Sequence, residues 1–327
     1  MPRPVTMSSG QWWDVPFEKL CEKMADFGYD GIELACWGDH FDVERALSDD
    51  AYLPRHRDIL EKHGLKCYAI SNHNAGQAIC DVIDEKNQFA LPAHIWGDGK
   101  EDGVRRRAAE NMQNAARAAA QFGVQVVTGF TGSPIWRHLF YWRPDMAEVI
   151  ERGYQFFADM WNPVLDVFQE EDVRFALEVH PTEIAFDIVT SERAVEAIGR
   201  RKEFGFNYDP SHMGYQSVDY VGFIRQFRDR IYHVHMKDAY WSPTPTQAGV
   251  FGGHLPFGDP RRYWDFRSVG RGMIDFESVI RALNEIGYDG PLSVEFEDPT
   301  MDREQGAQEG LAFVRDLDFT PAKQTQN

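Results

Sequence analysis

Short apolar runs alternate with amphipathic stretches along the whole chain, and there are eight of each. The runs are rich in β-branched and aromatic residues, which favours strands, whereas the stretches between them repeat apolar residues at helical spacing. This alternation is typical of a parallel sheet covered by helices. The predicted strands cover residues 5–8, 31–35, 66–73, 124–131, 174–180, 204–212, 231–238 and 291–297, and the predicted helices cover residues 16–27, 51–63, 104–122, 144–171, 190–200, 219–228, 275–286 and 303–316.

Eight pairs of strand and helix predict a closed (β/α)8 barrel, or TIM barrel, with a doubly wound open sheet as the alternative. A repeated motif supports a repeated unit. FGYDGIELACWGDH (27–40) and IGYDGPLSVEFEDP (286–299) both pass from a helix end through Gly-Tyr-Asp-Gly into a strand that ends in an acid. Helix caps are expected at Asp275, with Gly287 after the helix end, and at Ser191.

Two predicted connections are longer than the usual two to six residues or so, and both follow strand ends. They are residues 74–103 after the third strand and 239–274 after the seventh. Residues 239–269 are rich in Gly, Pro and aromatic residues, and we expect them to be irregular. Barrel active sites lie at the carboxyl ends of the strands, so both long loops are expected to be lids or binding loops.

Composition narrows the class of protein. The chain has 327 residues and a net charge of −18. Its length suits one barrel, and we expect residues 1–327 to form a single domain. The negative charge repels phosphate backbones, so no nucleic-acid partner is expected. No apolar stretch approaches the roughly 20 residues of a membrane span and the amino terminus lacks a leader, which favours a cytoplasmic protein with no membrane partner.

Four predicted strands of the second half end in residues that bind metal ions: Glu178, Asp209, His235 and Glu295. Parallel strands that each deliver one such residue at the carboxyl end bring them together at one face of a barrel. Charges buried there are costly unless they pair or bind an ion. Three carboxylates and one imidazole suit Mn²⁺ first, with Mg²⁺, Co²⁺ and Zn²⁺ as alternatives. We therefore expect one divalent metal ion.

The sequence resembles the xylose isomerase-like TIM barrels, the sugar phosphate isomerase/epimerase superfamily. The motifs that carry the resemblance are ALEVHPTE, FNYDPSH, YHVHMKD and GRGMIDF followed by GPLSVEFE. The resemblance implies that the same four strand-end residues bind one metal and that Glu178 and Glu295 are also the catalytic acid and base. It further implies that His212, in a D-x-x-H segment, and His73, after the third strand, contact the substrate.

Other candidates for substrate binding have alternative roles. His180 faces the same way as Glu178 and is either a substrate contact or a hydrogen-bonded core histidine. Glu33 binds substrate or forms an ion pair inside the barrel, and Trp37 stacks on a sugar or packs. Arg271 is one of several arginines after the seventh strand, which either hold a phosphate or make surface pairs. No Gly-rich phosphate loop is present, so an unphosphorylated substrate is expected.

The expected function is a metal-dependent isomerase or 3-epimerase acting on a keto sugar or polyol derivative. A glutamate removes a proton next to a carbonyl, and a metal stabilises the resulting enediolate. The alternative is a lyase or dehydratase acting by β-elimination on a 3-oxo-glycoside or inosose, for which the resemblance implies a small partner subunit. An abasic-site endonuclease-like hydrolase would need a further histidine on the fourth strand and a D-x-H motif, which the chain lacks. The resemblance also implies a homodimer or homotetramer.

Overall fold

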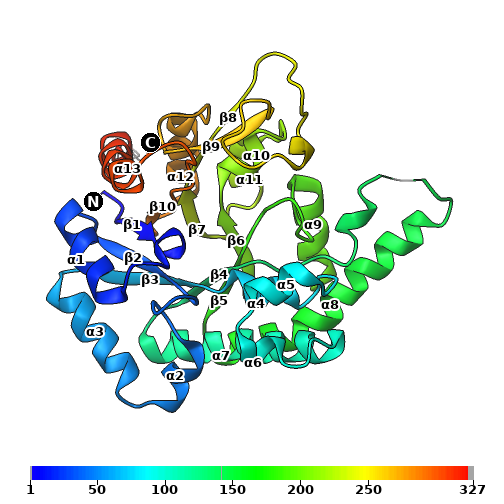
Figure 1. Cartoon of the computed structure of the whole chain (residues 1–327), viewed down its shortest axis with the longest axis horizontal. Coiled ribbons are helices and arrows are strands. Elements are labelled where there is room, and N and C mark those ends of the chain that lie inside the picture. Colours follow the sequence, from blue (N-terminus) through cyan, green and yellow to red (C-terminus); the bar gives the residue numbers. More distant parts are fainter. Residues whose placement is uncertain (1, 141, 323–327) are drawn as a thin grey trace, which may run out of the picture.

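Eight parallel strands close into a barrel (Figure 1) in the order β1-β10-β7-β6-β5-β4-β3-β2. The computed structural model describes residues 2–140 and 142–322. The barrel is the predicted fold, and the open sheet is excluded because β1 pairs with both β2 and β10. The strands are β1 (Val5–Ser8), β2 (Gly31–Ala35), β3 (Lys66–Ser71), β4 (Val126–Gly129), β5 (Arg174–Glu178), β6 (Phe204–Tyr208), β7 (Ile231–Met236) and β10 (Leu292–Val294).

Helices surround the strands (Figure 1) and bury their apolar faces against them. The eight helices that alternate with the strands lie within a few residues of their predicted bounds. They are α1 (Phe17–Phe27), α3 (Tyr52–Lys62), α7 (Glu101–Phe122), α8 (Met146–Glu170), α9 (Ile188–Ala197), α11 (Tyr220–Gln226), α12 (Phe276–Ile286) and α13 (Arg303–Leu317). None of the helices in residues 2–140 and 142–322 is both long and apolar enough to cross a membrane.

The repeated Gly-Tyr-Asp-Gly motif is the turn from a helix into a strand. Gly28 ends α1 with φ of 97°, and Gly287 ends α12 with φ of 73°, a left-handed conformation that L residues adopt only with strain. The predicted cap at Asp275 is present, because its side chain accepts a hydrogen bond from the Ser278 amide. The predicted cap at Ser191 is wrong. Asp187 caps α9 instead, and it outcompetes Ser191 because it forms a reciprocal pair with Thr190.

The segment expected to be irregular contains a β-hairpin. Strand β8 (Asp238–Trp241) pairs antiparallel with β9 (Trp264–Arg267), and the segment between them protrudes beyond the helices (yellow in Figure 1). Trp264 and Phe266 alternate with polar residues in β9 and pack with Tyr215 in a small cluster of their own. The surrounding glycines and prolines concealed this short period-two pattern in the sequence.

The other long connection, after β3, is also ordered. It folds into three short helices, α4 (His73–Ala78), α5 (Glu85–Ala90) and α6 (Ala93–Trp96). Two further short helices follow β2 and β6, namely α2 (Val43–Ser48) and α10 (Pro210–Gly214). Both long insertions lie beyond the carboxyl ends of their strands, so they surround the end of the barrel at which the strand-end residues converge.

Candidate metal centre

The four strand-end residues meet at the carboxyl end of the barrel. Glu178 is the last residue of β5, His235 is near the end of β7, and Asp209 and Glu295 follow directly after β6 and β10. Parallel pairing aligns these ends, and one ligand atom from each residue lies within 4.8 Å of the others. All four side chains are buried. The geometry therefore matches the arrangement expected from the strand spacing.

The cluster has the features of a cation site. Asp209 Oδ1 accepts a hydrogen bond from the Ser211 amide, and its buried Oδ2 accepts no well-aligned hydrogen bond from the described residues, with His212 Nε2 3.3 Å away. Glu295 Oε1 accepts a hydrogen bond from the Gln11 side chain, and its buried Oε2 lies 3.0 Å from His235 Nδ1 and 3.1 Å from the Lys237 ammonium. Three buried carboxylates with oxygen atoms within 4.8 Å of one another repel each other, and a divalent cation between them would offset that repulsion. The donor set of three carboxylates and one imidazole fits such an ion.

His235 is held from behind by Glu33. The Nε2 atom of His235 lies 2.9 Å from Glu33 Oε2, while its Nδ1 atom lies 3.0 Å from Glu295 Oε2. An imidazole fixed by a carboxylate on one nitrogen presents the other to a metal. Burial alone would raise the pKa of Glu33, but the imidazoles of His235 and His233 hold that pKa well below its usual value. Glu33 is therefore an ionised partner inside the barrel.

The predicted substrate contact of Glu33 is not supported. Its Oε2 atom contacts His233 at 3.0 Å and accepts a hydrogen bond from Ser293 at 2.8 Å, and its Oε1 atom accepts from Thr128 at 2.9 Å. These partners engage both oxygens of the Glu33 carboxylate below the metal cluster, and only 1% of Glu33 is exposed. Of the two alternatives for Glu33, the structure shows the ion pair in the barrel interior.

Glu178 is bracketed by two histidines. Nε2 of His73 lies 2.9 Å from Glu178 Oε2, and Nε2 of His212 lies 3.0 Å from Glu178 Oε1. Burial opposes the charge of Glu178, but these contacts hold its pKa well below the usual value. Burial likewise opposes the charge of His212, yet Asp209 and Glu178 raise the pKa of that imidazole to about 9. The two histidines therefore stabilise and orient an ionised carboxylate.

A cavity of about 460 Å³ opens above the cluster. Glu178 and Glu295 line it. So do three of the predicted substrate-binding residues: Trp37, His73 and His180. His212 lies on the wall too, with its ring centroid 4.2 Å from that of His180. Burial and the neighbouring His212 hold the pKa of His180 well below its usual value, so that imidazole is neutral. His180 therefore presents a neutral imidazole on the cavity wall.

The model of the xylose isomerase-like TIM barrel family matches residues 21–317. The chain belongs to this family. An uncharacterized protein of Bacillus subtilis (strain 168), YfiH, is 22% identical over 321 residues, which cover 92% of this chain and 95% of that protein. An inosose dehydratase of Lacticaseibacillus casei is 33% identical over 90 residues, which cover 28% of this chain and 29% of the dehydratase.

Solved structures of other xylose isomerase-like proteins superpose on most of the barrel. D-psicose 3-epimerase from Clostridium cellulolyticum H10 with D-tagatose gives a TM-score of 0.64 at 15% identity, covering 96% of this chain and 99% of the epimerase. The 3-keto-D-glucoside 4-epimerase of E. coli gives 0.65 at 14% identity, covering 96% and 99%. A Mycobacterium smegmatis protein of the same fold in complex with magnesium gives 0.63 at 14% identity, covering 96% of each chain. At these identities the likeness shows the fold.

The predicted substrate contact of Arg271 is not supported in this xylose isomerase-like barrel. Arg271 does not line the cavity above the cluster. Its guanidinium is more than half exposed and pairs with Glu309 of α13 at 2.7 Å. The Asp238 carboxylate accepts hydrogen bonds from the amides of Gly270 and Gly272, the two neighbours of Arg271. These bonds hold the turn that contains Arg271 against the base of the insertion. Arg271 thus makes the surface pair that was its alternative role.

Lys237 is a residue of the site that the sequence interpretation missed. Its ammonium lies 3.1 Å from Glu295 Oε2 and 2.6 Å from Glu297 Oε2, and it sits 4.4 Å from the centre of the Phe266 ring. Burial opposes its charge, but Glu295 and Glu297 hold its pKa well above the usual value. The signal was available, because Lys237 follows His235 by two residues and alternation places both on one face.

Proposed function

We propose that this protein is a divalent-metal-dependent isomerase or 3-epimerase of an unphosphorylated keto sugar or polyol derivative. The observation that carries the proposal is the pair Glu178 and Glu295. Both carboxylates belong to the metal cluster and both line the cavity above it. Burial alone would raise their pKa values, but Lys237 and His235 lower the pKa of Glu295 to about 2, and His212 and His73 lower that of Glu178. Both are ionised, as a general base requires.

Glu178, Asp209, His235 and Glu295 are the residues that would hold the metal. A divalent ion, when bound there, supplies a Lewis acid that stabilises negative charge on oxygen atoms next to the reacting carbon. The oxygen-rich donor set favours Mn²⁺ or Mg²⁺ over a structural zinc site. One solved structure of this fold holds magnesium and another holds a zinc atom, which supports a divalent ion at this end of the barrel.

The two glutamates would move the proton. One carboxylate removes the proton from the carbon next to the carbonyl, and the bonding electrons pass to the carbonyl oxygen, which gives an enediolate. The other carboxylate comes from β10, separated from β5 by β6 and β7 in the barrel. It can deliver, from a different side, a proton that it takes up from water, and the first carboxylate then releases its own proton to water. Protonation of the same carbon on the opposite face inverts it. Protonation of the neighbouring carbon, with the hydroxyl proton passing to the former carbonyl oxygen, moves the carbonyl.

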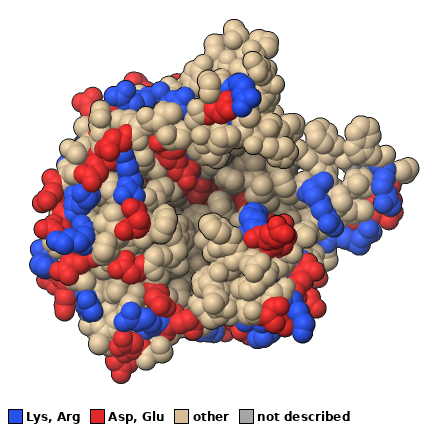
Figure 2. Space-filling model, viewed as in Figure 1, with Lys and Arg blue, Asp and Glu red and all other residues tan. Residues whose placement is uncertain are grey.

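The rest of the cavity suits a sugar. Trp37, Phe130 and Phe266 give it apolar walls that can pack on the C–H faces of a ring, while His180 and Lys237 offer polar contacts to hydroxyl groups. Lys237 and His212, both buried, also shield the developing charge from water. Figure 2 shows acidic and basic side chains interspersed over this face around a central hollow, with no broad basic surface for a nucleic acid.

A second candidate is elimination by the same first step. A proton removed next to a ketone can be followed by loss of a β-hydroxyl or glycosyl group, as in a dehydratase or lyase. Two observations favour it: the 33% identity to an inosose dehydratase over 90 residues, and the ammonium of Lys237 on the cavity wall, which can protonate a leaving oxygen. A small partner subunit and a dimer or tetramer stay predictions.

Deuterium exchange in D₂O tests the proposal. Purified protein with Mn²⁺ is incubated with ketoses, methyl 3-oxo-glucosides and inososes, and NMR follows the carbon next to each carbonyl. We expect metal-dependent deuterium uptake in at least one class, with retention of all carbon–oxygen bonds. Uptake accompanied by an unsaturated product would establish the elimination instead. The absence of uptake in every class with metal bound would refute both candidates.

A further inference from the structure

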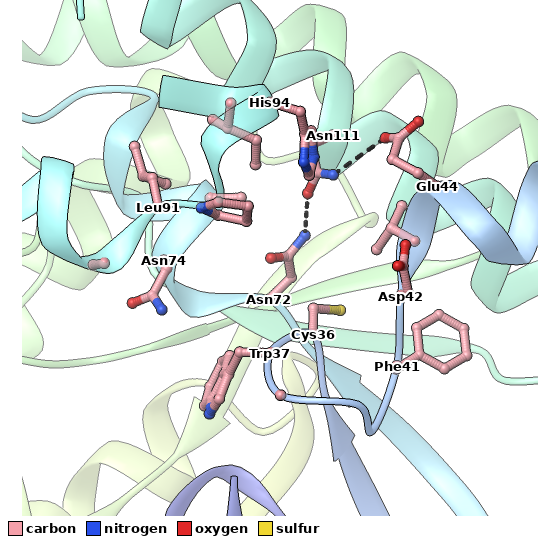
Figure 3. Close-up of a pocket in the computed structure, with 16 residues that line it drawn as sticks. Cys36, Trp37, Phe41, Asp42, Glu44, Asn72, Asn74, Leu91, His94 and Asn111 are labelled. Carbon is pink, nitrogen blue, oxygen red and sulfur yellow. Dashed lines mark hydrogen bonds between the residues drawn. The ribbon is translucent and has the colours of Figure 1, made fainter. Parts of the chain in front are cut away.

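A second cavity lies beside the metal-site cavity. It has a volume of about 400 Å³ and is enclosed by the segment after β2, the start of α4, the α5–α6 segment and α7 (Figure 3). Trp37 and Asn74 line both cavities, so these two side chains form a shared wall. Both volumes fall within the range of about 300 to 1,000 Å³ that is usual for small-molecule sites. The chemistry proposed above uses only the first cavity.

One wall of the second cavity carries a row of polar groups, in which two buried amides lead to an exposed carboxylate. Asn72 Nδ2 donates to Asn111 Oδ1 at 2.9 Å, and Asn111 Nδ2 donates to Glu44 Oε1 at 3.4 Å (Figure 3). Asn72 is 4% exposed and Asn111 is 6% exposed. The side-chain Oδ1 of Asn72 accepts no hydrogen bond from the described residues and points into the cavity (Figure 3). Buried amides that are only partly paired favour a polar ligand or water.

The charge of the lining defines the ligand class. Asp42 and Glu44 contribute carboxylates, and no lysine or arginine is among the residues that line the cavity. A phosphate or carboxylate would therefore be repelled. Amides and carboxylates together can donate to and accept from adjacent hydroxyl groups. Phe41 and Leu91 add apolar surface against which a ring can pack. These features select a neutral polyhydroxylated ligand.

We propose that the second cavity binds a second neutral sugar or polyol unit of the substrate. The keto unit lies at the metal centre, and the linkage passes over the wall formed by Trp37 and Asn74. The substrate class is then a keto glycoside or keto disaccharide, larger than a single ketose. This inference rests on the proposed function for the place of the chemistry, but the occupancy of the second cavity is a separate property.

A steric variant tests the proposal. Ala90 ends α5 and lines the second cavity, so Ala90→Phe fills it, whereas Gln88→Phe adds the same ring at an exposed position on α5 that does not line it. Asn111→Leu removes the central amide as an independent variant. The measurement is the ratio of kcat/KM for deuterium exchange of 3-oxo-cellobiose to that of methyl 3-oxo-glucoside, with Mn²⁺ bound and the fold checked by melting.

We expect the wild type to prefer the two-ring sugar by at least tenfold, and Ala90→Phe and Asn111→Leu to reduce that ratio at least tenfold while Gln88→Phe keeps it. A ratio near one in the wild type, or a ratio unchanged in both cavity variants, would overturn the proposal. If neither sugar exchanges, the proposed function fails, and saturation-transfer NMR with unmodified cellobiose and methyl glucoside decides on the cavity. Equal binding of both, unaffected by Ala90→Phe, would then overturn it.

Discussion

The contact between Glu33 and His235 allows a sharp test of how the barrel interior supports the metal centre. Glu33→Gln keeps the shape of the side chain and removes its charge. In the structure, Glu33 Oε2 lies 2.9 Å from His235 Nε2 and is buried with the residue 1% exposed. The amide keeps one acceptor oxygen but carries no negative charge, so it holds the imidazole less firmly in the orientation with Nδ1 toward the cluster.

The expected loss follows from the role of such partners in metal sites. Replacing a carboxylate behind a ligating histidine weakens metal binding by about 10- to 100-fold, or about 1.4 to 2.7 kcal/mol. Burial and a contact at full hydrogen-bond distance favour the upper half of that range. Ser293→Ala is the matched control. It removes a neutral donor at 2.8 Å from the same oxygen and leaves the charge, so we expect at most about a threefold loss.

Calorimetric titration of the metal-free proteins with Mn²⁺ measures the difference, and thermal melting confirms that each variant is folded. We expect Glu33→Gln to bind Mn²⁺ at least tenfold more weakly than Ser293→Ala. A folded Glu33→Gln variant with wild-type affinity would refute the inference that Glu33 positions His235.

Three further outcomes follow from the structure. Lys237→Met should reduce deuterium exchange at least tenfold and move the acid limb of the pH–rate profile to higher pH, since the ammonium lowers the pKa of Glu295; an unchanged limb would contradict this. Burial raises the pKa of Glu183 from 4.5 to about 8. The contribution of Glu183 to the free energy of unfolding is therefore most favourable below about pH 4.5 and falls as the pH rises to 8. At about 1.4 kcal/mol per pH unit, the free energy lost over this range is at most about 5 kcal/mol. Urea unfolding should show that Glu183→Gln gains stability relative to the wild type between pH 5 and 8. A stability difference that stays constant over this range would contradict the raised pKa. Gly76→Ala places a Cβ 2.1 Å from the Phe130 carbonyl oxygen and should cost about 3 kcal/mol or more in urea unfolding, whereas a neutral effect would contradict that contact.

The barrel and its cluster could be predicted because both depend on local patterns. Each strand is a short apolar run, and its last residues lie at a known end of the barrel. Glu178 and Asp209 follow this rule directly. Predicting that they meet residues from β7 and β10 therefore required only the number and order of the strands. The family resemblance added roles for these residues, but the periodicity alone indicated where they meet.

Contacts across the barrel could not be predicted. Glu33 meets His233 and Ser293, which are 200 and 260 residues away, and such a contact depends on the register between strands. The sequence therefore left open whether Glu33 binds substrate. The β8–β9 hairpin was missed because glycine and proline dominate its surroundings, and with it the wall formed by Trp264 and Phe266. Arg271 was predicted to bind substrate only because a guanidinium can bind a phosphate or carboxylate. In the structure the turn at Gly270 directs it to Glu309 at the surface.

Deuterium exchange by two glutamate variants with metal bound tests directly whether Glu178 and Glu295 move the proton. Glu178→Gln and Glu295→Gln retain an oxygen that can ligate the ion but cannot accept the proton, and Glu309→Gln, at the surface, is the matched control. Metal occupancy is measured in each sample, and the substrate is whichever sugar the wild type exchanges. We expect the exchange rate to fall at least about 100-fold in both cluster variants and to stay unchanged in the control. Exchange near the wild-type rate in both metal-loaded variants would contradict the proposed acid and base pair.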